Sequence, residues 1–154
     1  DEVRNQVLPA IQKQGPVVAW IVDDTGFPKK GKHSVGVVRQ YCGQVGKQEN
    51  CRVAVSLSVA TWSSSLPIAY RLYLPKEWTK DTARLDKAGV PKAYRAYRTR
   101  HQLALEMLEN NGAALPHRWI GGDDEMGRPY WFRRRLAALG EQYLLAVPSN
   151  TSVA

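Results

Sequence analysis

Residues 17–24 read VVAWIVDD, a run of six small or apolar residues followed at once by Asp23 and Asp24. A continuous apolar run of this length is typical of a central strand that is buried on both faces. We therefore predict a strand over residues 17–22 that ends at the two carboxylates. A shorter stretch repeats the pattern, because residues 118–122 read RWIGG and run into a second acidic cluster, Asp123, Asp124 and Glu125.

Alternation and helical spacing predict the elements around these two stretches. Residues 53–60 and 67–74 alternate in polarity, which predicts a β-hairpin. Pro91 and Pro129 each precede apolar residues at helical spacing and can open a helix, where the missing N–H of proline costs nothing. The other predicted elements are the tail of a helix over residues 1–14, a short strand around residues 37–42 within the loop-rich residues 25–52, and a last strand over residues 142–147.

The order of these elements predicts an α/β fold, with a mixed sheet that begins as a meander of three strands and continues with alternating helices and strands. In this fold residues 17–22 lie at the middle of the sheet beside residues 118–122, and the hairpin is antiparallel on one side. The two acidic clusters then meet at the same edge, across a strand spacing of about 4.8 Å.

Paired carboxylates at a sheet edge indicate a divalent cation. Two carboxylates held so close raise each other's pKa unless a cation joins them. Oxygen ligands without a nearby His or Cys favour Mg²⁺ or Mn²⁺, and paired ions of this kind catalyse phosphoryl transfer. The alternative is structural, because strands end at the surface and often carry charges there.

The net charge favours an anionic partner. The chain has 154 residues, and its 22 Lys and Arg against 14 Asp and Glu give a formal net charge of +8. A basic excess of this size favours nucleic acid, although many basic proteins bind none. The candidates for contact with DNA phosphates lie in the loop after Asp23 and around the second predicted helix: Lys29, Lys30, Lys32, Arg128 and Arg133. A solvated loop or helix face is the alternative for each.

The remaining composition excludes two other classes of site. Cys42 and Cys51 lie nine residues apart without a CxxC spacing or a nearby His pair, which argues against zinc. They could pair across a hairpin, but a reducing compartment favours buried free thiols. No apolar run approaches the roughly 20 residues that a membrane span needs.

Two blocks of sequence carry a family resemblance. Residues 20–31, WIVDDTGFPKKG, and residues 34–43, SVGVVRQYCG, resemble the first catalytic block of bacterial insertion-sequence transposases in the DDE superfamily. Residues 122–148 resemble the second block through Gly122-Asp123, Gly127 and the run YLLAVP, although Met126 stands where that block usually has Tyr.

This resemblance implies an RNase H-like catalytic domain that cleaves and joins DNA strands with Mg²⁺ or Mn²⁺. On the family pattern, Asp23 is the first catalytic and metal-binding carboxylate, and Asp24 is its near alternative. Asp123 is the second catalytic and metal-binding carboxylate, with Asp124 as a secondary candidate.

The third catalytic residue of the family, a Glu on a later helix, has no counterpart here. Glu125 is too close to Asp123 to replace it, and Glu141 stands at the wrong end of the last predicted strand. We therefore expect residues 16–154 to form an RNase H-like core truncated before its last helix, after residues 1–15 that end a preceding helical segment. Such a fragment would bind metal weakly and be inactive by itself.

The resemblance also implies the partners. It implies double-stranded DNA at transposon ends, self-association of the full-length protein, no membrane contact, and a place at the nucleoid in a bacterial cytoplasm. Two alternatives stay open: another RNase H-like nuclease, such as a resolvase or ribonuclease, and a catalytically dead remnant that only binds DNA or a protein. The loop over residues 25–32 favours the transposase, whereas the missing Glu favours the remnant.

Overall fold

The computed structural model describes residues 2–112 and 115–151. Its helices are α1 Glu2–Gln12, α2 Lys76–Thr79, α3 Thr82–Lys87, α4 Arg100–Gly112, α5 Asp124–Gly127 and α6 Tyr130–Ala138, with short 3₁₀ turns η1 Gly43–Val45 and η2 Lys92–Tyr94. Its strands are β1 Ala19–Pro28, β2 Val38–Cys42, β3 Lys47–Ala60, β4 Ser65–Leu72, β5 Trp119–Gly122 and β6 Tyr143–Leu145. Residue 1 of the predicted helix tail and residues 152–154 of the predicted core lie outside the described residues.

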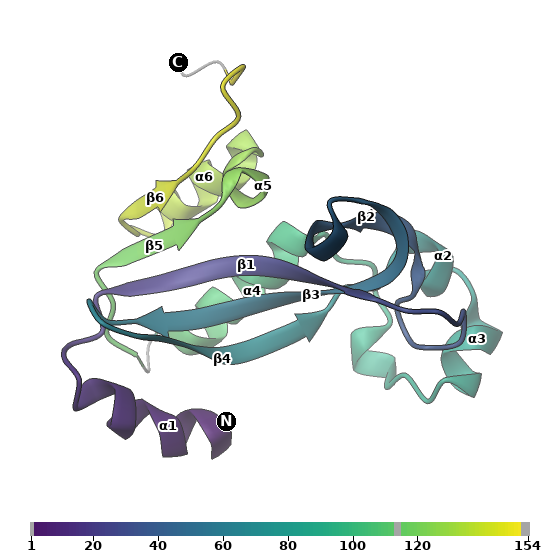
Figure 1. Cartoon of the computed structure of the whole chain (residues 1–154), viewed down its shortest axis with the longest axis horizontal. Coiled ribbons are helices and arrows are strands. Elements are labelled where there is room, and N and C mark those ends of the chain that lie inside the picture. The colour runs from purple at the N-terminus through teal and green to yellow at the C-terminus, as the bar shows by residue number, and fades with distance from the viewer. Residues whose placement is uncertain (1, 113–114, 152–154) are drawn as a thin grey trace. The chain divides into compact units, whose positions relative to one another are not determined.

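The strands form a mixed sheet in the order β2-β3-β1-β5-β6, and β4 also pairs with β3 (Figure 1). Strand β1 is parallel to β5, and β5 is parallel to β6. Helices α5 and α6 form the crossover that the parallel pair β5 and β6 needs. Strand β2 is antiparallel to β3. The predicted α/β fold, with β1 at the middle of the sheet beside β5, is confirmed.

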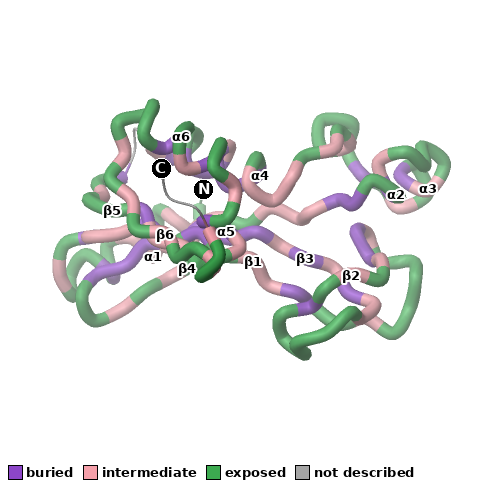
Figure 2. Tube along the Cα trace, turned by 90° about the horizontal axis from the view of Figure 1, so that it is seen from above, coloured by how far each residue is buried: buried purple, intermediate pink, exposed green. Residues whose placement is uncertain are grey.

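The chain divides into two compact units, which we call the acidic unit and the basic unit for their net charges, given below. The acidic unit comprises Asp1–Asp23, Ser56–Tyr70 and Ala104–Ala154, and the basic unit comprises Asp24–Val55 and Arg71–Leu103. Each unit has buried apolar residues of its own, and Figure 2 shows the buried residues in purple.

The core of the acidic unit forms on one face of β1 and β5. Trp20 and Val22 of β1 and Ile120 of β5 have no exposed surface. Trp20 is paired with Ile120 in the sheet register, so the two side chains lie on the same face. Ile21, which points to the other face, is 37% exposed. Strand β1 is therefore buried on one face in this unit, and the prediction of burial on both faces was wrong.

The basic unit has a small core formed mainly by the segment between β4 and α4. Leu74, Trp78, Leu85 and Val90 are buried together. The Trp78 indole donates from Nε1 to the Val37 carbonyl over 2.9 Å, which joins this segment to the loop before β2. A second cluster contains Cys42, Cys51 and Val53, and both cysteines are buried free thiols, as predicted.

The structure corrects the predicted end of the central strand. Strand β1 does not end at Val22 but continues through Asp23 and Asp24 to Pro28. The Lys29 amide still donates to the Asn50 carbonyl over 2.8 Å, so pairing with β3 holds the chain extended beyond the apolar run. Backbone pairing, which the run of side chains does not report, decides where this strand stops.

Short helices also departed from the prediction. Helices α2 and α3 lie in the polar residues 76–92, for which no helix was predicted, because Trp78 and Leu85 supply the few apolar contacts they need. Pro91 precedes only η2, and α4 begins at Arg100. Pro129 does open α6, as predicted.

Candidate active site

Asp23 and Asp123 occupy matching positions on neighbouring parallel strands of the acidic unit. The register pairs Val22 of β1 with Gly122 of β5, and each Asp is the next residue along its strand. Asp123 keeps an extended backbone, with φ −76° and ψ −173°. Because side chains alternate along a strand, both carboxylates belong to the face of Ile21 and not to the buried face of Trp20. The meeting of Asp23 and Asp123 at one cation stays a prediction.

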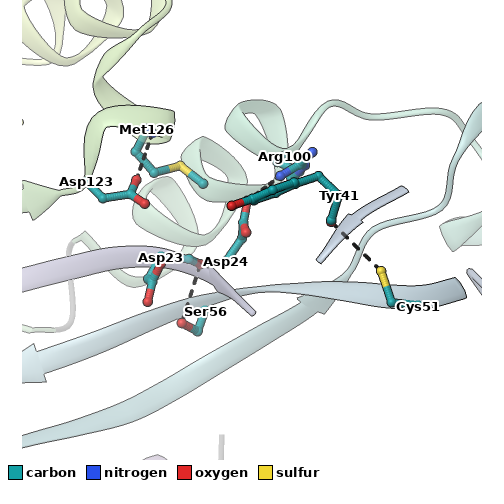
Figure 3. A network of polar contacts seen from close by, with 8 residues as sticks. All are labelled: Asp23, Asp24, Tyr41, Cys51, Ser56, Arg100, Asp123 and Met126. Atoms are coloured by element: carbon teal, nitrogen blue, oxygen red, sulfur yellow. Dashed lines mark hydrogen bonds and ion pairs between the residues drawn. The ribbon is translucent and has the colours of Figure 1, made fainter. Parts of the chain in front are cut away.

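Asp123 is also the N-cap residue of α5. Its Oδ1 accepts a hydrogen bond from the Met126 amide over 3.0 Å (Figure 3). An Asp in this position satisfies an amide at the start of a helix that has no carbonyl partner within the helix. The cap fixes the side-chain rotamer and engages one oxygen of the carboxylate.

Gly127 explains the spacing of the second block. A Cβ atom at this position would lie 1.8 Å from the Ala146 carbonyl oxygen, so only glycine allows α5 to approach the chain after β6 this closely. The Gly127 amide donates to the Asp123 carbonyl over 2.9 Å. Asp123 and Gly127 are thus the two ends of one tight turn, which places the carboxylate at the end of β5.

Asp24, the near alternative to Asp23, has a different environment in the basic unit. It lies on the opposite face of β1, and its Oδ2 accepts a hydrogen bond from Nη1 of Arg100 over 2.7 Å (Figure 3). The two side chains are 19% and 24% exposed. The Arg100 guanidinium also lies 5.7 Å from the centre of the Tyr73 ring. Sequence reasoning missed Arg100 as this partner, and no local pattern identifies a contact between residues 76 positions apart.

A divalent ion would meet suitable ligand chemistry at Asp23 and Asp123, but few ligands. Both are carboxylates, the ligands that Mg²⁺ and Mn²⁺ prefer. Within residues 2–112 and 115–151, no group of three or more His, Cys, Asp or Glu side chains is arranged to hold a metal ion. Glu141 Oε2 accepts a hydrogen bond from His117 Nε2 over 2.7 Å, and this His stacks on Trp20. Asp23 and Asp123 therefore match the ligand preference of Mg²⁺ and Mn²⁺, and together they would supply two carboxylates.

The other candidates differ in how far they are engaged. Asp124 lies in the first turn of α5 and forms an exposed ion pair with Arg128 at 3.6 Å. Arg133 donates to the Gly127 and Arg128 carbonyls. These two arginines therefore support the turn around Asp123. In contrast, Lys30 and Lys32 are exposed in the loop after β1.

Comparison with known proteins identifies the family. The description "DDE superfamily endonuclease" matches residues 1–154. The chain belongs to the DDE superfamily. Its members are in general metal-dependent enzymes, and the resemblance carried by residues 20–43 and 122–148 is confirmed at this level.

Two transposases are similar to parts of the DDE chain. A probable transposase for insertion sequence element IS701 from Microchaete diplosiphon is 33% identical over 75 residues, which are 49% of this chain and 20% of that protein. The cryo-EM structure of the piggyBac transposase synaptic complex with hairpin DNA matches with a TM-score of 0.52 and 10% identity, over 96% of this chain and 28% of that one. At this identity the match shows the fold alone, which is RNase H-like. The DDE chain spans about a fifth of the length of the curated relative it matches.

No helix among the described residues of the DDE chain is both long and apolar enough to cross a membrane.

Proposed function

We propose that this chain supplies two catalytic carboxylates, Asp23 and Asp123, to a DNA transposase that cleaves DNA strands and joins them to new sites. The observation that carries the proposal is the register of β1 and β5, whose last pair is Val22 and Gly122, the residues directly before Asp23 and Asp123. Bound Mg²⁺ or Mn²⁺ would supply the charge that activates the attacking oxygen and stabilises the leaving one. The double-stranded DNA of transposon ends is the proposed substrate.

Asp23 is preferred over Asp24 for two reasons. Asp24 belongs to the other face of β1, and Arg100 already neutralises it across a half-buried ion pair. Asp23 is exposed. An ion from solvent can reach an exposed carboxylate directly, which favours Asp23.

The test compares three isosteric variants in the protein that contains this chain. We expect Asp23→Asn and Asp123→Asn to abolish Mn²⁺-dependent cleavage of a transposon-end duplex and to leave duplex binding unchanged or stronger, because each removes a negative charge. Asn at position 123 can still cap α5, so a loss of activity there does not reflect a lost helix. Asp24→Asn is the matched control and should retain more activity.

The outcomes separate the alternatives. Cleavage that survives Asp23→Asn but not Asp24→Asn would assign the role to Asp24. Cleavage that survives all three variants would end the carboxylate proposal.

A second function is a catalytically dead DNA- or protein-binding module. It is favoured by the finding that the described residues contain no group of three metal-ligating side chains. It predicts that the wild-type protein binds the duplex without cleaving it at any Mg²⁺ or Mn²⁺ concentration.

A further inference from the structure

The positive charge of the chain belongs to one of its two units. Of the 22 Lys and Arg side chains, 15 lie in the basic unit, together with 5 of the 14 Asp and Glu. The basic unit therefore has a formal charge of +10, and the acidic unit, with 7 basic and 9 acidic side chains, has −2. An anionic partner is attracted to the basic unit, although both proposed catalytic carboxylates lie in the acidic one.

The loop after β1 is held by its backbone and presents its side chains to solvent. The Asn50 side chain donates to the Lys29 and Gly31 carbonyls, and the Asn50 carbonyl accepts from the Lys29 amide. On the other side, Arg84 of α3 donates from Nη2 to the Lys32 carbonyl over 2.7 Å. Lys30 and Lys32 are exposed. Their main chain is thus fixed before any ligand binds, which lowers the entropy cost of binding.

Helix α3 is fixed to the same loop. The Arg84 guanidinium lies 3.7 Å from the centre of the Trp78 ring, and Trp78 is buried in the small core of this unit. The loop and the segment from α2 to α3 therefore form one supported structure. Two exposed lysines, Lys80 and Lys87, lie at the ends of α2 and α3.

Two of the three acidic side chains of this segment have a described partner, and the third, Glu77, is exposed. Asp81 caps α3 by accepting from the Arg84 amide over 2.9 Å. Asp86 pairs with Arg95 at 2.6 Å. No ion pair is described for Lys30, Lys32, Lys80 or Lys87 within residues 2–112 and 115–151, so their charge is available to an external anion.

We propose that these four residues, the lysine surface, bind the phosphate backbone of duplex DNA independently of the metal-binding carboxylates. Lysine ammonium groups act as point charges for phosphates, and contacts of this type position DNA without reading its sequence. The lysine surface rests on the proposed function only in taking DNA as the partner. It adds residues 76–87, which the family motifs do not include, to the loop of Lys30 and Lys32 that was already a candidate for phosphate contact.

The experiment measures binding of a labelled duplex by the protein that contains this chain, in EDTA, across a salt series. Removal of divalent ions separates this surface from the carboxylates. We expect Lys30→Gln/Lys32→Gln and Lys80→Gln/Lys87→Gln each to weaken binding of unrelated duplexes equally. We also expect each to reduce the slope of log affinity against log salt by about 2, since one phosphate contact contributes about 0.9. The control, Lys13→Gln/Arg134→Gln, removes the same charge from the acidic unit and should leave the slope unchanged.

The outcomes distinguish this inference from the proposed function. If the wild-type protein binds the duplex and the lysine variants keep its salt slope or match the control, the lysine surface is overturned. The transposase proposal would still stand in that case. Wild-type protein that binds no duplex at any salt concentration would overturn both. Single-stranded RNA that displaces the duplex at lower concentration than unlabelled duplex would show that the partner is not DNA.

Discussion

At the scale of single residues, Gly127 is a position in the second block where the structure leaves no room for a side chain. The carbonyl of Ala146 occupies the space that a Cβ would need. This is a backbone atom, so it cannot move aside as a flexible side chain would. The Gly in this block is thus explained by close approach of two backbone segments and needs no direct part in chemistry.

We predict that Gly127→Ala lowers the free energy of unfolding by about 1–3 kcal/mol, the usual cost of overpacking. Urea denaturation measures it. Gly43→Ala is the matched control, because a Cβ at Gly43 meets no atom within 4 Å. Equal stability of the two variants would contradict the close approach.

The ion pair between Asp24 and Arg100 gives a second prediction at this scale. Both side chains are half-buried, so the pair should contribute more than an exposed one and less than a fully buried one. We expect a double-mutant cycle with Asp24→Asn and Arg100→Met to give a coupling energy of roughly 1 kcal/mol in urea denaturation. Strictly additive effects would show that the pair contributes nothing to stability.

At the scale of elements, α5 ties the candidate site to the fold. The helix spans only Asp124–Gly127, so its cap is a large part of what holds it. Asp123 provides this cap from the end of β5. The carboxylate is therefore oriented by the element that follows it, and β5 alone does not set its rotamer.

We predict that Asp123→Ala is less stable than Asp123→Asn by about 1 kcal/mol, the typical value of an N-cap, although both variants lack the carboxylate. Thermal or urea unfolding of the two proteins measures the difference. Stability that is the same in both variants would show that the hydrogen bond to the Met126 amide does not contribute.

At the scale of the whole molecule, the buried Cys51 and the partly buried Tyr73 of the basic unit contribute to stability at alkaline pH. Burial, and after it the neighbouring Cys42 thiol, raises the pKa of Cys51 from 9.0 to about 11. Burial, with the hydrogen bond to Tyr97, raises the pKa of Tyr73 from 10.0 to about 12. The folded protein keeps these protons at pH values where the unfolded chain has lost them.

This stabilisation is complete below pH 9 and is lost as the pH rises through about 11 for Cys51 and 12 for Tyr73. We expect the free energy of unfolding to fall by up to about 1.4 kcal/mol per pH unit for each group, from pH 9 for Cys51 and from pH 10 for Tyr73. Urea denaturation between pH 8 and pH 11 measures the slope, which should be shallower in Tyr73→Phe. A slope that both proteins share would exclude Tyr73 as a source.

Local patterns in the sequence were sufficient for much of the fold. The apolar run before Asp23, the alternation over residues 53–60 and the proline before α6 each predicted an element that the structure contains. The order of these elements predicted that β1 and β5 are parallel neighbours, because a strand that follows a helical crossover pairs in parallel. The adjacency of Asp23 and Asp123 in the sheet register could therefore be predicted without coordinates.

Contacts between distant residues decided the rest. Three contacts join segments that no local pattern connects. They are the ion pair between Arg100 and Asp24, the approach of Ala146 to Gly127, and the hydrogen bonds of Arg84 and Asn50 to the loop after β1. The same holds for α2 and α3, whose few apolar residues become buried only because Val35 and Val38 lie against them. Side-chain periodicity reports which face of an element is apolar, whereas pairing, capping and charge distribution depend on which elements meet. For this protein the sequence by itself predicted the family, the pairing of β1 with β5 and the two candidate carboxylates, and the tertiary structure decided which face of β1 is buried and where the positive charge gathers.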